Sequence, residues 1–315
     1  MEIINSDYPF PLSDEMAATI GFFDGVHAGH CYLLDQLKRL ADAHQIPSMA
    51  ITFSQYPQSV LNQGFQQELL STLDERLERL SLSGIDYCLL LDFTPELARL
   101  SAREFIQRKL KREWFVKLLL IGYDHRFGKN REEDFHDYVR YGKECGMEIR
   151  QALELPDVAV SSTIIRNYLL DRNVQEANRL LSYCYRLEGK VVEGNRLGRE
   201  IGFPTANIDV NDKSKIIPGE GIYASHVYWK QKRQEGMAYI GKRPTVTFRG
   251  GKRIEVHLFD FSGDLYGETL QLEFVEFLRE DMRFENLEAL KNQLFADREA
   301  AIVALKNMRL SQKSL

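Results

Sequence analysis

Apolar runs and helix-like segments alternate through roughly the first 180 residues of the chain. The apolar runs predict buried strands at 17–22, 49–53, 85–93, 115–121 and 147–153. Apolar residues at helical spacing predict helices at 33–41, 73–80, 134–144, 163–170 and 175–181. Thr72 with Glu75 and Ser101 with Glu104 have capping-box spacing, so each pair predicts the start of a helix. Strands that alternate with helices indicate a parallel sheet covered on both faces.

The pattern changes after Ser182, where glycines begin to separate short segments. Apolar and polar residues alternate with period two in 222–229 and 254–261, as on strands with one buried face. The segment 261–266 predicts a hairpin turn between strands, and 286–308 has the apolar spacing of a helix. We therefore expect an α/β domain over 1–182, and a small antiparallel β-barrel with a terminal helix over 183–315.

Length and composition support two domains and exclude several classes of protein. A chain of 315 residues is about twice the usual size of one domain. The formal net charge of -5, from 41 Lys and Arg against 46 Asp and Glu, argues against nucleic-acid binding through bulk charge. No apolar stretch approaches the roughly 18 residues of a membrane helix, and the first residues show no signal-peptide pattern.

The four cysteines form no CxxC pair, so we expect reduced thiols and neither a disulfide framework nor a zinc ribbon. Together these features predict a cytoplasmic protein with no membrane or nucleic-acid partner. The oligomeric state cannot be read from the sequence.

The segment 21–30, GFFDGVHAGH, stands where the first predicted strand gives way to the first helix. Helix N-terminal N–H groups favour anions, and Gly25 and Gly29 let the backbone come close to a phosphate. His27 and His30 can face one anion and neutralise charge on a leaving pyrophosphate. A metal-binding pair and two solvated histidines are the alternatives, although two histidines without a third ligand make a poor zinc site.

Two further segments of the first half are candidates for a ligand site. Ser161–Thr163 followed by Arg166 would provide a helix cap and a fixed cation, but a capped helix without a ligand is the plainer interpretation. The segment 122–128, GYDHRFG, follows a predicted strand. It therefore lies at the carboxyl edge of the sheet, where open α/β sheets bind ligands.

The second half contains three segments that suit phosphate transfer. The glycine-spaced basic loop Gly194–Arg199 could fold over phosphates, although glycine loops are also common turns. Thr205 and Asn207 would share one face of a strand, which suits Mg²⁺ held mainly by water and ATP phosphates; a β-turn with an Asx cap is the alternative. Glu255 lies on a predicted strand, where its carboxylate could accept a proton from a hydroxyl or simply face solvent.

In combination, the first-half motifs resemble the nucleotidyltransferase module of the bacterial bifunctional riboflavin kinase/FAD synthetase family. The matching motifs are FDGxHxGH at 23–30, TFxxxPxxVL at 52–61, GxDxRFG at 122–128 and SSTxIR at 161–166. The resemblance implies a Rossmann-like fold, catalytic roles for His27 and His30, and flavin contacts for Asp124 and Arg126. It also implies that ATP is bound by Gly21, Phe23, Asp24, Gly25, His27, Gly29, His30, Ser161, Ser162, Thr163 and Arg166.

Two departures from the family pattern fall in this half. Gln55-Tyr56 stand where the family usually has Pro-His, and His125 stands where it commonly has Phe. Both positions belong to segments expected near the flavin or the nucleotide. The flavin end therefore follows the family pattern less closely than the ATP end does.

The second half resembles the riboflavin kinase module of the same family from Tyr185 to Asp297. The shared motifs are GFPTAN at 202–207, IGxxPT at 240–245, EVH at 255–257, DF at 260–261 and LYG at 265–267. The resemblance makes Glu255 the base for the riboflavin 5′-hydroxyl and assigns Thr205 and Asn207 to Mg²⁺-ATP. It also implies a phosphate flap that contains Gly194, Gly198 and Arg199.

The leading hypothesis is a bifunctional enzyme that phosphorylates riboflavin to FMN and adenylylates FMN to FAD, with ATP and Mg²⁺ at both sites. One alternative keeps the kinase but retunes the adenylyltransferase to another phosphorylated substrate, which the departures at 55–56 and 125 leave open. Another alternative is a flavin-sensing protein without catalysis, which the intact Thr205, Asn207 and Glu255 disfavour.

Overall fold

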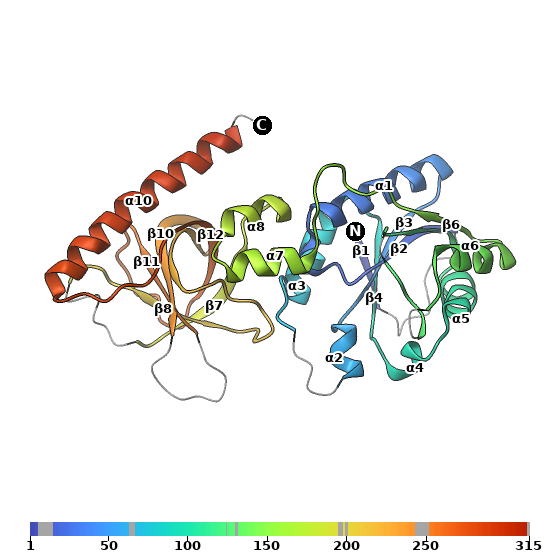
Figure 1. The fold of residues 1–315 in the computed structure, drawn as a ribbon, viewed down its shortest axis with the longest axis horizontal. Coiled ribbons are helices and arrows are strands. Elements are labelled where there is room, and N and C mark those ends of the chain that lie inside the picture. The colour runs from blue at the N-terminus through green and yellow to red at the C-terminus, as the bar shows by residue number, and fades with distance from the viewer. Residues whose placement is uncertain are drawn as a thin grey trace. The chain divides into compact units, whose positions relative to one another are not determined.

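The computed structural model of the chain describes residues 1–5, 15–62, 67–123, 125–129, 132–194, 198, 201–242 and 252–313. Its contacts divide the chain into two compact units, Met1–Ser161 and Ser162–Leu315, each with its own sheet (Figure 1). The helices predicted at 163–170 and 175–181 therefore group with the second unit. Within the described ranges, no helix is long and apolar enough to cross a membrane.

The first unit is built on a six-stranded sheet in the order β1-β4-β3-β2-β5-β6, and all its strand pairs are parallel. The strands are β1 (Glu2–Asn5), β2 (Met16–Ile20), β3 (Ser48–Phe53), β4 (Tyr87–Leu91), β5 (Val116–Ile121) and β6 (Glu148–Gln151). The predicted parallel α/β fold is confirmed. The edge strand β1 has only Ile4 buried, which explains why its apolar pattern did not predict a strand.

Helices connect these strands, and two of them start at the predicted caps. The helical segments are η1 (Asp24–Val26), α1 (Ala28–His44), α2 (Pro57–Leu61), α3 (Leu73–Ser81), α4 (Pro95–Ala98), α5 (Ala102–Glu104), the π-helical η2 (Phe105–Glu113) and α6 (Phe135–Glu144). Both predicted capping boxes are present, at α3 and at α5. In each, the cap hydroxyl accepts from the glutamate N–H and the glutamate carboxylate accepts from the cap N–H.

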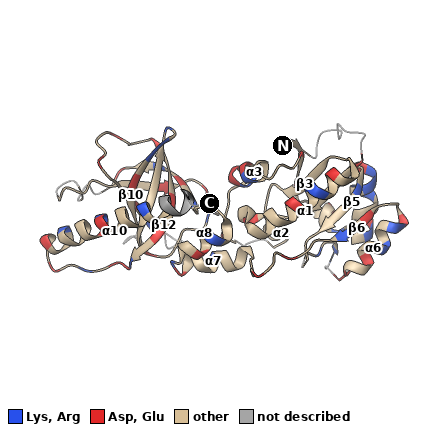
Figure 2. Cartoon of the chain, turned by 90° about the horizontal axis from the view of Figure 1, so that it is seen from above, with Lys and Arg blue, Asp and Glu red and all other residues tan. Residues whose placement is uncertain are grey.

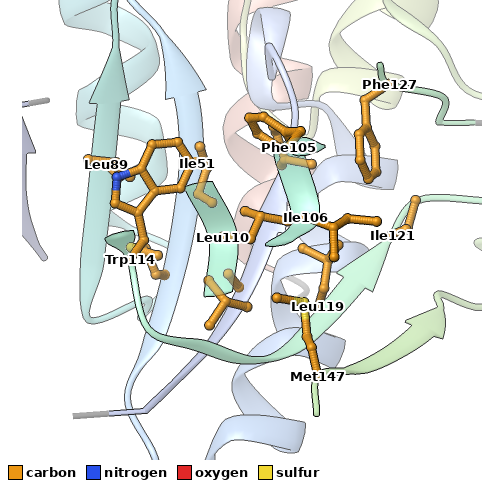
Figure 3. Close-up of a cluster of buried hydrophobic side chains, with 14 of the residues drawn as sticks. Ile51, Leu89, Phe105, Ile106, Leu110, Trp114, Leu119, Ile121, Phe127 and Met147 are labelled. Atoms are coloured by element: carbon orange, nitrogen blue, oxygen red, sulfur yellow. The ribbon is translucent and has the colours of Figure 1, made fainter. Parts of the chain in front are cut away.

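Alternate residues of β2 face two separate cores. Met16 and Ala18 belong to a cluster that also contains Phe105 of η2 and Tyr138 of α6. Figure 3 shows part of this cluster, including Phe105. Ala17, between them in sequence, packs with Leu37 of α1 and Leu80 of α3 on the opposite face. Burial on both faces makes the central strands apolar throughout, as their sequence shows.

The strand order reverses at β2, because β3 lies on one side of it and β5 on the other. The segment 21–30 follows β2, and the segment 122–128 follows β5. Both segments therefore stand at the carboxyl ends of neighbouring strands, at the point where an open parallel sheet binds ligands.

The second unit contains a closed barrel in the strand order β10-β11-β8-β7-β12-β9, with all neighbours antiparallel. The strands are β7 (Arg186–Val192), β8 (Ala206–Val210), β9 (Gly221–Trp229), β10 (Lys232–Lys242), β11 (Lys252–Leu258) and β12 (Thr269–Arg279). The predicted antiparallel barrel is confirmed, and its closure leaves no free strand edge among these strands.

The hairpin predicted at 261–266 is wrong. This segment connects β11 to β12, which are not neighbours, because the two edges of β11 pair with β10 and β8. A local turn is present, since the Tyr266 N–H donates to the Asp264 carboxylate at 3.0 Å. Turn residues bend the chain, but the closure of the barrel decides which strands pair.

Helices α7 (Ser162–Leu170), α8 (Val174–Leu181) and α10 (Leu287–Lys313) complete the described part of this unit. Asn178 of α8 accepts from the Tyr185 N–H at 2.7 Å and donates to the Phe274 carbonyl at 2.8 Å, which ties α8 to the barrel. The predicted terminal helix is confirmed as α10. It carries charges of both signs along its length (Figure 2), and Asp297 pairs there with Arg279 of β12 at 2.7 Å.

Candidate active sites

The loop between β2 and α1 has an unusual backbone. Phe23, Gly25 and Val26 have φ angles of 56°, 77° and 39°. Glycine adopts this left-handed region freely, but Phe23 and the β-branched Val26 each cost about 1–3 kcal/mol there. Such strain persists only where surrounding contacts hold the loop, and it clusters at ligand sites.

Asp24 is one of the residues that hold this loop. Its buried carboxylate accepts from the backbone N–H of Leu70 at 2.9 Å and of Ser71 at 3.1 Å. The Ser71 hydroxyl oxygen accepts in turn from the Gly25 N–H at 2.9 Å. The Asp24 carboxylate, which the resemblance assigns to ATP, is thus engaged with the protein, and this arrangement suits a role in shaping the loop.

His27 and His30 lie side by side at the start of α1. Their rings are stacked, with centroids 3.7 Å apart and planes inclined by 17°. His27 caps the helix, because its Nδ1 accepts from the His30 N–H at 3.3 Å. The Phe23 ring meets His30 edge-on at 5.2 Å. The structure therefore brings both predicted histidines together at a helix N-terminus.

The environment keeps the His30 imidazole neutral. Desolvation, followed by the nearby His27 and His125, holds the pKa of His30 well below its usual range. Its Nδ1 atom is buried and has no hydrogen-bond partner among the residues that the structure describes. Within those same residues, no group of three or more His, Cys, Asp or Glu side chains could hold a metal ion.

Gly29 and Gly21 allow close packing around these rings. A Cβ atom on Gly29 would lie 2.9 Å from Val160 Cγ1 and 3.3 Å from the His27 ring. A Cβ atom on Gly21 would lie 3.0 Å from the Phe23 ring. Side chains at these positions would displace the rings that face the site.

The loop after β5 is fastened to α6 through Phe127. The Phe127 N–H donates to the Tyr138 hydroxyl at 3.1 Å, and the two rings stack with centroids 4.4 Å apart. Arg126, next to this anchor, is exposed. Asp124, its predicted companion at the flavin, lies outside the described residues.

The SSTxIR motif falls where the two units divide. Ser161 is the last residue of the first unit, and α7 begins at Ser162 in the second. Within α7, the Arg166 guanidinium donates to the Thr163 hydroxyl at 3.2 Å, so the predicted cation and hydroxyl are neighbours on one turn. Their approach to the histidine pair stays a prediction.

In the barrel, Asn207, Glu255 and Tyr239 form a row across three adjacent strands. Glu255 of β11 lies directly opposite Asn207 of β8 and Tyr239 of β10. Directly opposite residues share one face of a sheet. The Thr205 hydroxyl donates to Glu255 Oε2 at 3.1 Å. The structure therefore brings Thr205, Asn207 and Glu255 together. Thr205 itself lies just before β8, which begins at Ala206, and not on the strand as the sequence analysis expected.

Of the described glycines of the predicted phosphate flap, Gly194 packs against this row and Gly198 packs against the turn that precedes β8. A Cβ atom on Gly194 would overlap Asn207 Nδ2, and one on Gly198 would overlap the Phe203 carbonyl oxygen. The Phe203 N–H also donates to the Gly198 carbonyl at 2.8 Å. Arg199 lies outside the described residues. Glycine at 194 thus allows the Asn207 amide to take its place beside Glu255.

Two residues beside Glu255 were not predicted. Arg253 forms an ion pair with Glu255 Oε1, and their spacing of two on a strand was an available signal that was not used. The Tyr239 hydroxyl donates to Asp281 at 2.9 Å, and burial raises the pKa of Tyr239 to about 12. No local pattern indicates this second contact, because it joins segments far apart in sequence.

His257 supports the turn that carries Thr205. Its Nδ1 lies 2.8 Å from the Pro204 carbonyl, which can only accept, so Nδ1 carries the proton. Burial lowers the pKa of His257, which favours this neutral form. The side chain therefore fixes the GFPTAN turn while Glu255, on the same strand, stays beside Thr205.

The two sites, one at the reversal of a parallel sheet and one on the face of a closed barrel, define a two-domain transferase. A family model described as FAD synthetase matches residues 11–164, and one described as riboflavin kinase matches residues 181–305. The chain belongs to the bifunctional riboflavin kinase/FMN adenylyltransferase family. The chain is an enzyme and contains both catalytic domains of this family. The matches do not favour the first alternative, an adenylyltransferase retuned to another substrate, or the second, a flavin sensor without catalysis.

Two named relatives agree with this assignment, and a solved structure shares the fold. The bifunctional riboflavin kinase/FMN adenylyltransferase of Escherichia coli K12 is 38% identical over 282 residues, which is 89% of each chain. That of Pseudomonas fluorescens is 38% identical over 286 residues, 90% of this chain and 91% of the relative. A crystal structure titled as a macrolide-efflux protein from Streptococcus pneumoniae has a TM-score of 0.85 and 31% identity, covering 96% of this chain and 99% of that one.

Proposed function

We propose that the chain makes FMN from riboflavin and ATP with residues 183–315, and FAD from FMN and a second ATP with residues 1–182. The observation that carries the proposal is the hydrogen bond from Thr205 to Glu255, with Asn207 directly opposite. It sets a carboxylate beside the hydroxyl and amide groups of one turn. That arrangement suits deprotonation of an alcohol next to a nucleotide.

In the kinase step, Glu255 accepts the proton of the riboflavin 5′-hydroxyl while the oxygen attacks the γ-phosphorus of ATP. The bond from the γ-phosphorus to the bridging oxygen breaks, and the products are FMN and ADP. Thr205 and Arg253 each engage one carboxylate oxygen, which orients the group. The Glu255 side chain is 13% exposed, so part of it stays open to a substrate.

The donors at this site fit Mg²⁺. Thr205 and Asn207 offer a hydroxyl and an amide oxygen, and Mg²⁺ prefers oxygen ligands, several of which it takes from water and phosphates. A metal shared in this way with ATP needs no closed cage of protein side chains. When bound, Mg²⁺ would neutralise charge on the ATP phosphates.

In the adenylyl step, a phosphate oxygen of FMN attacks the α-phosphorus of ATP and pyrophosphate leaves. The FMN phosphate is already an anion, so the protein needs alignment and charge stabilisation rather than a strong base. His27 and His30 would face the pyrophosphate at the start of α1. Phosphate oxygens beside His30 would raise its pKa and favour the imidazolium form, which donates from both ring nitrogens.

The remaining predicted residues complete this site. Arg166 with the hydroxyls of Ser161–Thr163 would bind the phosphates, and the loop 21–25 would close around the nucleotide. Arg126 is exposed and adjacent to the anchored Phe127. Arg126 and Asp124 would together bind the flavin. A cytoplasmic location belongs to the same proposal, and all four cysteines of the chain are free thiols.

Separate assays of the two reactions test the proposal. Purified protein is incubated with riboflavin, ATP and Mg²⁺, or with FMN, ATP and Mg²⁺, and the flavins are separated by chromatography. We expect FMN to appear before FAD in the first mixture, and FAD and pyrophosphate to form in equal amounts in the second. Removal of Mg²⁺ with a chelator should stop both reactions. FMN formation without any FAD from added FMN would contradict the adenylyltransferase half.

A further inference from the structure

Arg76 of α3 joins the carboxyl ends of two neighbouring strands. The residue is 2% exposed. One guanidinium nitrogen donates to the Phe22 carbonyl at 3.1 Å, and another donates to the Phe53 carbonyl at 2.5 Å. Phe22 lies in the loop that follows β2, and Phe53 ends β3. One planar side chain therefore fixes the spacing of two loops at the ligand-binding edge of the sheet.

Phe22 is further restrained by contacts around this bond. The Arg76 guanidinium carbon lies 4.1 Å from the centroid of the Phe22 ring. The Thr52 hydroxyl donates to the Phe22 carbonyl at 3.2 Å, and the Tyr56 ring meets the Phe22 ring edge-on at 5.0 Å. Thr52 and Tyr56 thus contact the carbonyl and the ring of Phe22. They belong to the end of β3 and the segment after it, and β3 pairs with β2.

Arg76 keeps its charge in this buried place. Burial lowers the pKa of Arg76 to about 10, so the guanidinium is protonated at neutral pH. It forms no salt bridge within the described ranges, and its electrostatic neighbour Asp24 bonds to Leu70 and Ser71 instead. Burial of a cation is costly, and two carbonyls and a ring face offset part of that cost, while the buried Nε has no hydrogen-bond partner among the described residues.

The start of α3 and the residues just before it hold the strained loop 22–26 at several places. Leu70 and Ser71, just before the helix, donate to Asp24, and Ser71 accepts from Gly25. Arg76, one turn into the helix, fixes Phe22 at the other end of the loop. The left-handed φ of Phe23, which lies between these restraints, requires such outside support.

We propose that Arg76 is a positioning residue for adenylyl transfer, which acts through the backbone of Phe22 to align the loop that carries His27 and His30. The inference rests on the proposed function of the first unit. Loss of the Arg76 bonds would let the loop shift. A displacement of catalytic groups by about 1 Å can lower a rate by about 100-fold.

The test uses the full-length protein. Arg76→Lys keeps the charge but loses the fork of donors, and Arg76→Met removes both. Arg39→Met on α1 is the matched control, because the Arg39 side chain is 78% exposed. We expect Arg76→Met to lower kcat for FAD formation by about 10- to 100-fold, and Arg76→Lys by less, with little change in the KM for ATP. Riboflavin phosphorylation, and both activities of Arg39→Met, should stay at the wild-type level.

Folding is followed separately through Trp114, which lies in the first unit, in a Trp229→Phe background. A loss of kcat that merely equals the loss of folded first unit would overturn the proposal, and so would wild-type kcat in both Arg76 variants. If Arg76→Met does not fold, the test rests on Arg76→Lys. A kcat equal to that of the wild type, or a loss of kcat no larger than the loss of folded first unit, would then overturn the proposal. Failure of the proposed function is distinguishable, because the wild-type protein itself would then form no FAD from FMN.

Discussion

Thr205 donates a hydrogen bond of 3.1 Å to Glu255, although 50 positions separate the two residues in sequence. The bond joins β11 to the turn before β8, so these residues meet because β8 and β11 are neighbours in the closed barrel. The predicted base and a predicted Mg²⁺-ATP ligand are thus in direct contact. Single substitutions at this site can therefore test the proposed role of each residue separately.

Glu255→Gln removes the proton acceptor while it keeps the shape of the side chain. We expect kcat for riboflavin phosphorylation to fall by about 10²- to 10⁴-fold, the usual contribution of a general base. Riboflavin binding, followed by flavin fluorescence, should not change. Glu188→Gln is the matched control, because Glu188 is an exposed residue of the barrel strand β7. Wild-type turnover in Glu255→Gln would remove Glu255 from its proposed role.

Gly194→Ala introduces a Cβ atom that overlaps the Asn207 amide nitrogen. Because the amide must move, we expect the KM for ATP in the kinase reaction to rise by about tenfold, with FAD formation from FMN unchanged. Gly263→Ala serves as the control, since the atoms that an added Cβ there meets, at 3.0 Å and beyond, belong to the Phe261 ring and to no residue of the predicted site. Steady-state kinetics of both reactions provide the measurement. An unchanged KM would speak against Asn207 as a ligand of Mg²⁺-ATP.

Asp297→Asn breaks the ion pair that attaches α10 to the barrel. Asp297 accepts from Arg279 at 2.8 and 2.7 Å and from Gln293 at 2.9 Å, and its side chain is 3% exposed. Removal of one partner of a buried pair costs about 3–5 kcal/mol, so the free energy of unfolding of this unit should fall by about that amount. Urea denaturation followed by Trp229 fluorescence, in a Trp114→Phe background, measures the change.

The control for Asp297 is the surface pair of Asp260 with Arg298. The Asp260 side chain is 87% exposed, so Asp260→Asn should change the free energy of unfolding by less than about 1 kcal/mol. Equal losses in the two variants would contradict a structural role for the buried pair.

The lowered pKa of His30 makes the stability of the first unit depend on pH. The unfolded chain binds a proton at His30 more readily than the folded protein does, so this contribution to stability is fully present above about pH 6.5. It is lost as the pH falls from there through the folded pKa, with a slope of about 1.4 kcal/mol per pH unit. We therefore expect the free energy of unfolding to fall between pH 7 and pH 5.

His30→Gln should flatten this slope, and His44→Gln should not, because His44 is exposed at the end of the same helix. Denaturation at each pH, followed through Trp114 in a Trp229→Phe background, gives the slopes. Indistinguishable slopes in wild type and His30→Gln would show that His30 does not carry the pH dependence.

The extent to which the fold could be predicted depended on how local each feature is. The capping boxes at Thr72 and Ser101 involve residues three apart, and both are present. The apolar strands of the first unit were visible because burial on two faces leaves a continuous apolar run. The edge strand β1 and the connection 261–266 were not predicted correctly, because pairing partners lie far away in sequence.

The candidate sites divide in the same way. The sequence alone determined which residues are the candidates for the chemistry, since histidine at a helix start, hydroxyl and amide groups beside glycines, and a strand carboxylate are properties of short segments. Only the tertiary structure decided what those residues contact: Asp24 bonds to Leu70 and Ser71, and Arg76 joins Phe22 to Phe53. The physical reason is that side-chain chemistry is encoded locally, whereas hydrogen-bond partners and burial depend on which strands and helices the whole fold brings together.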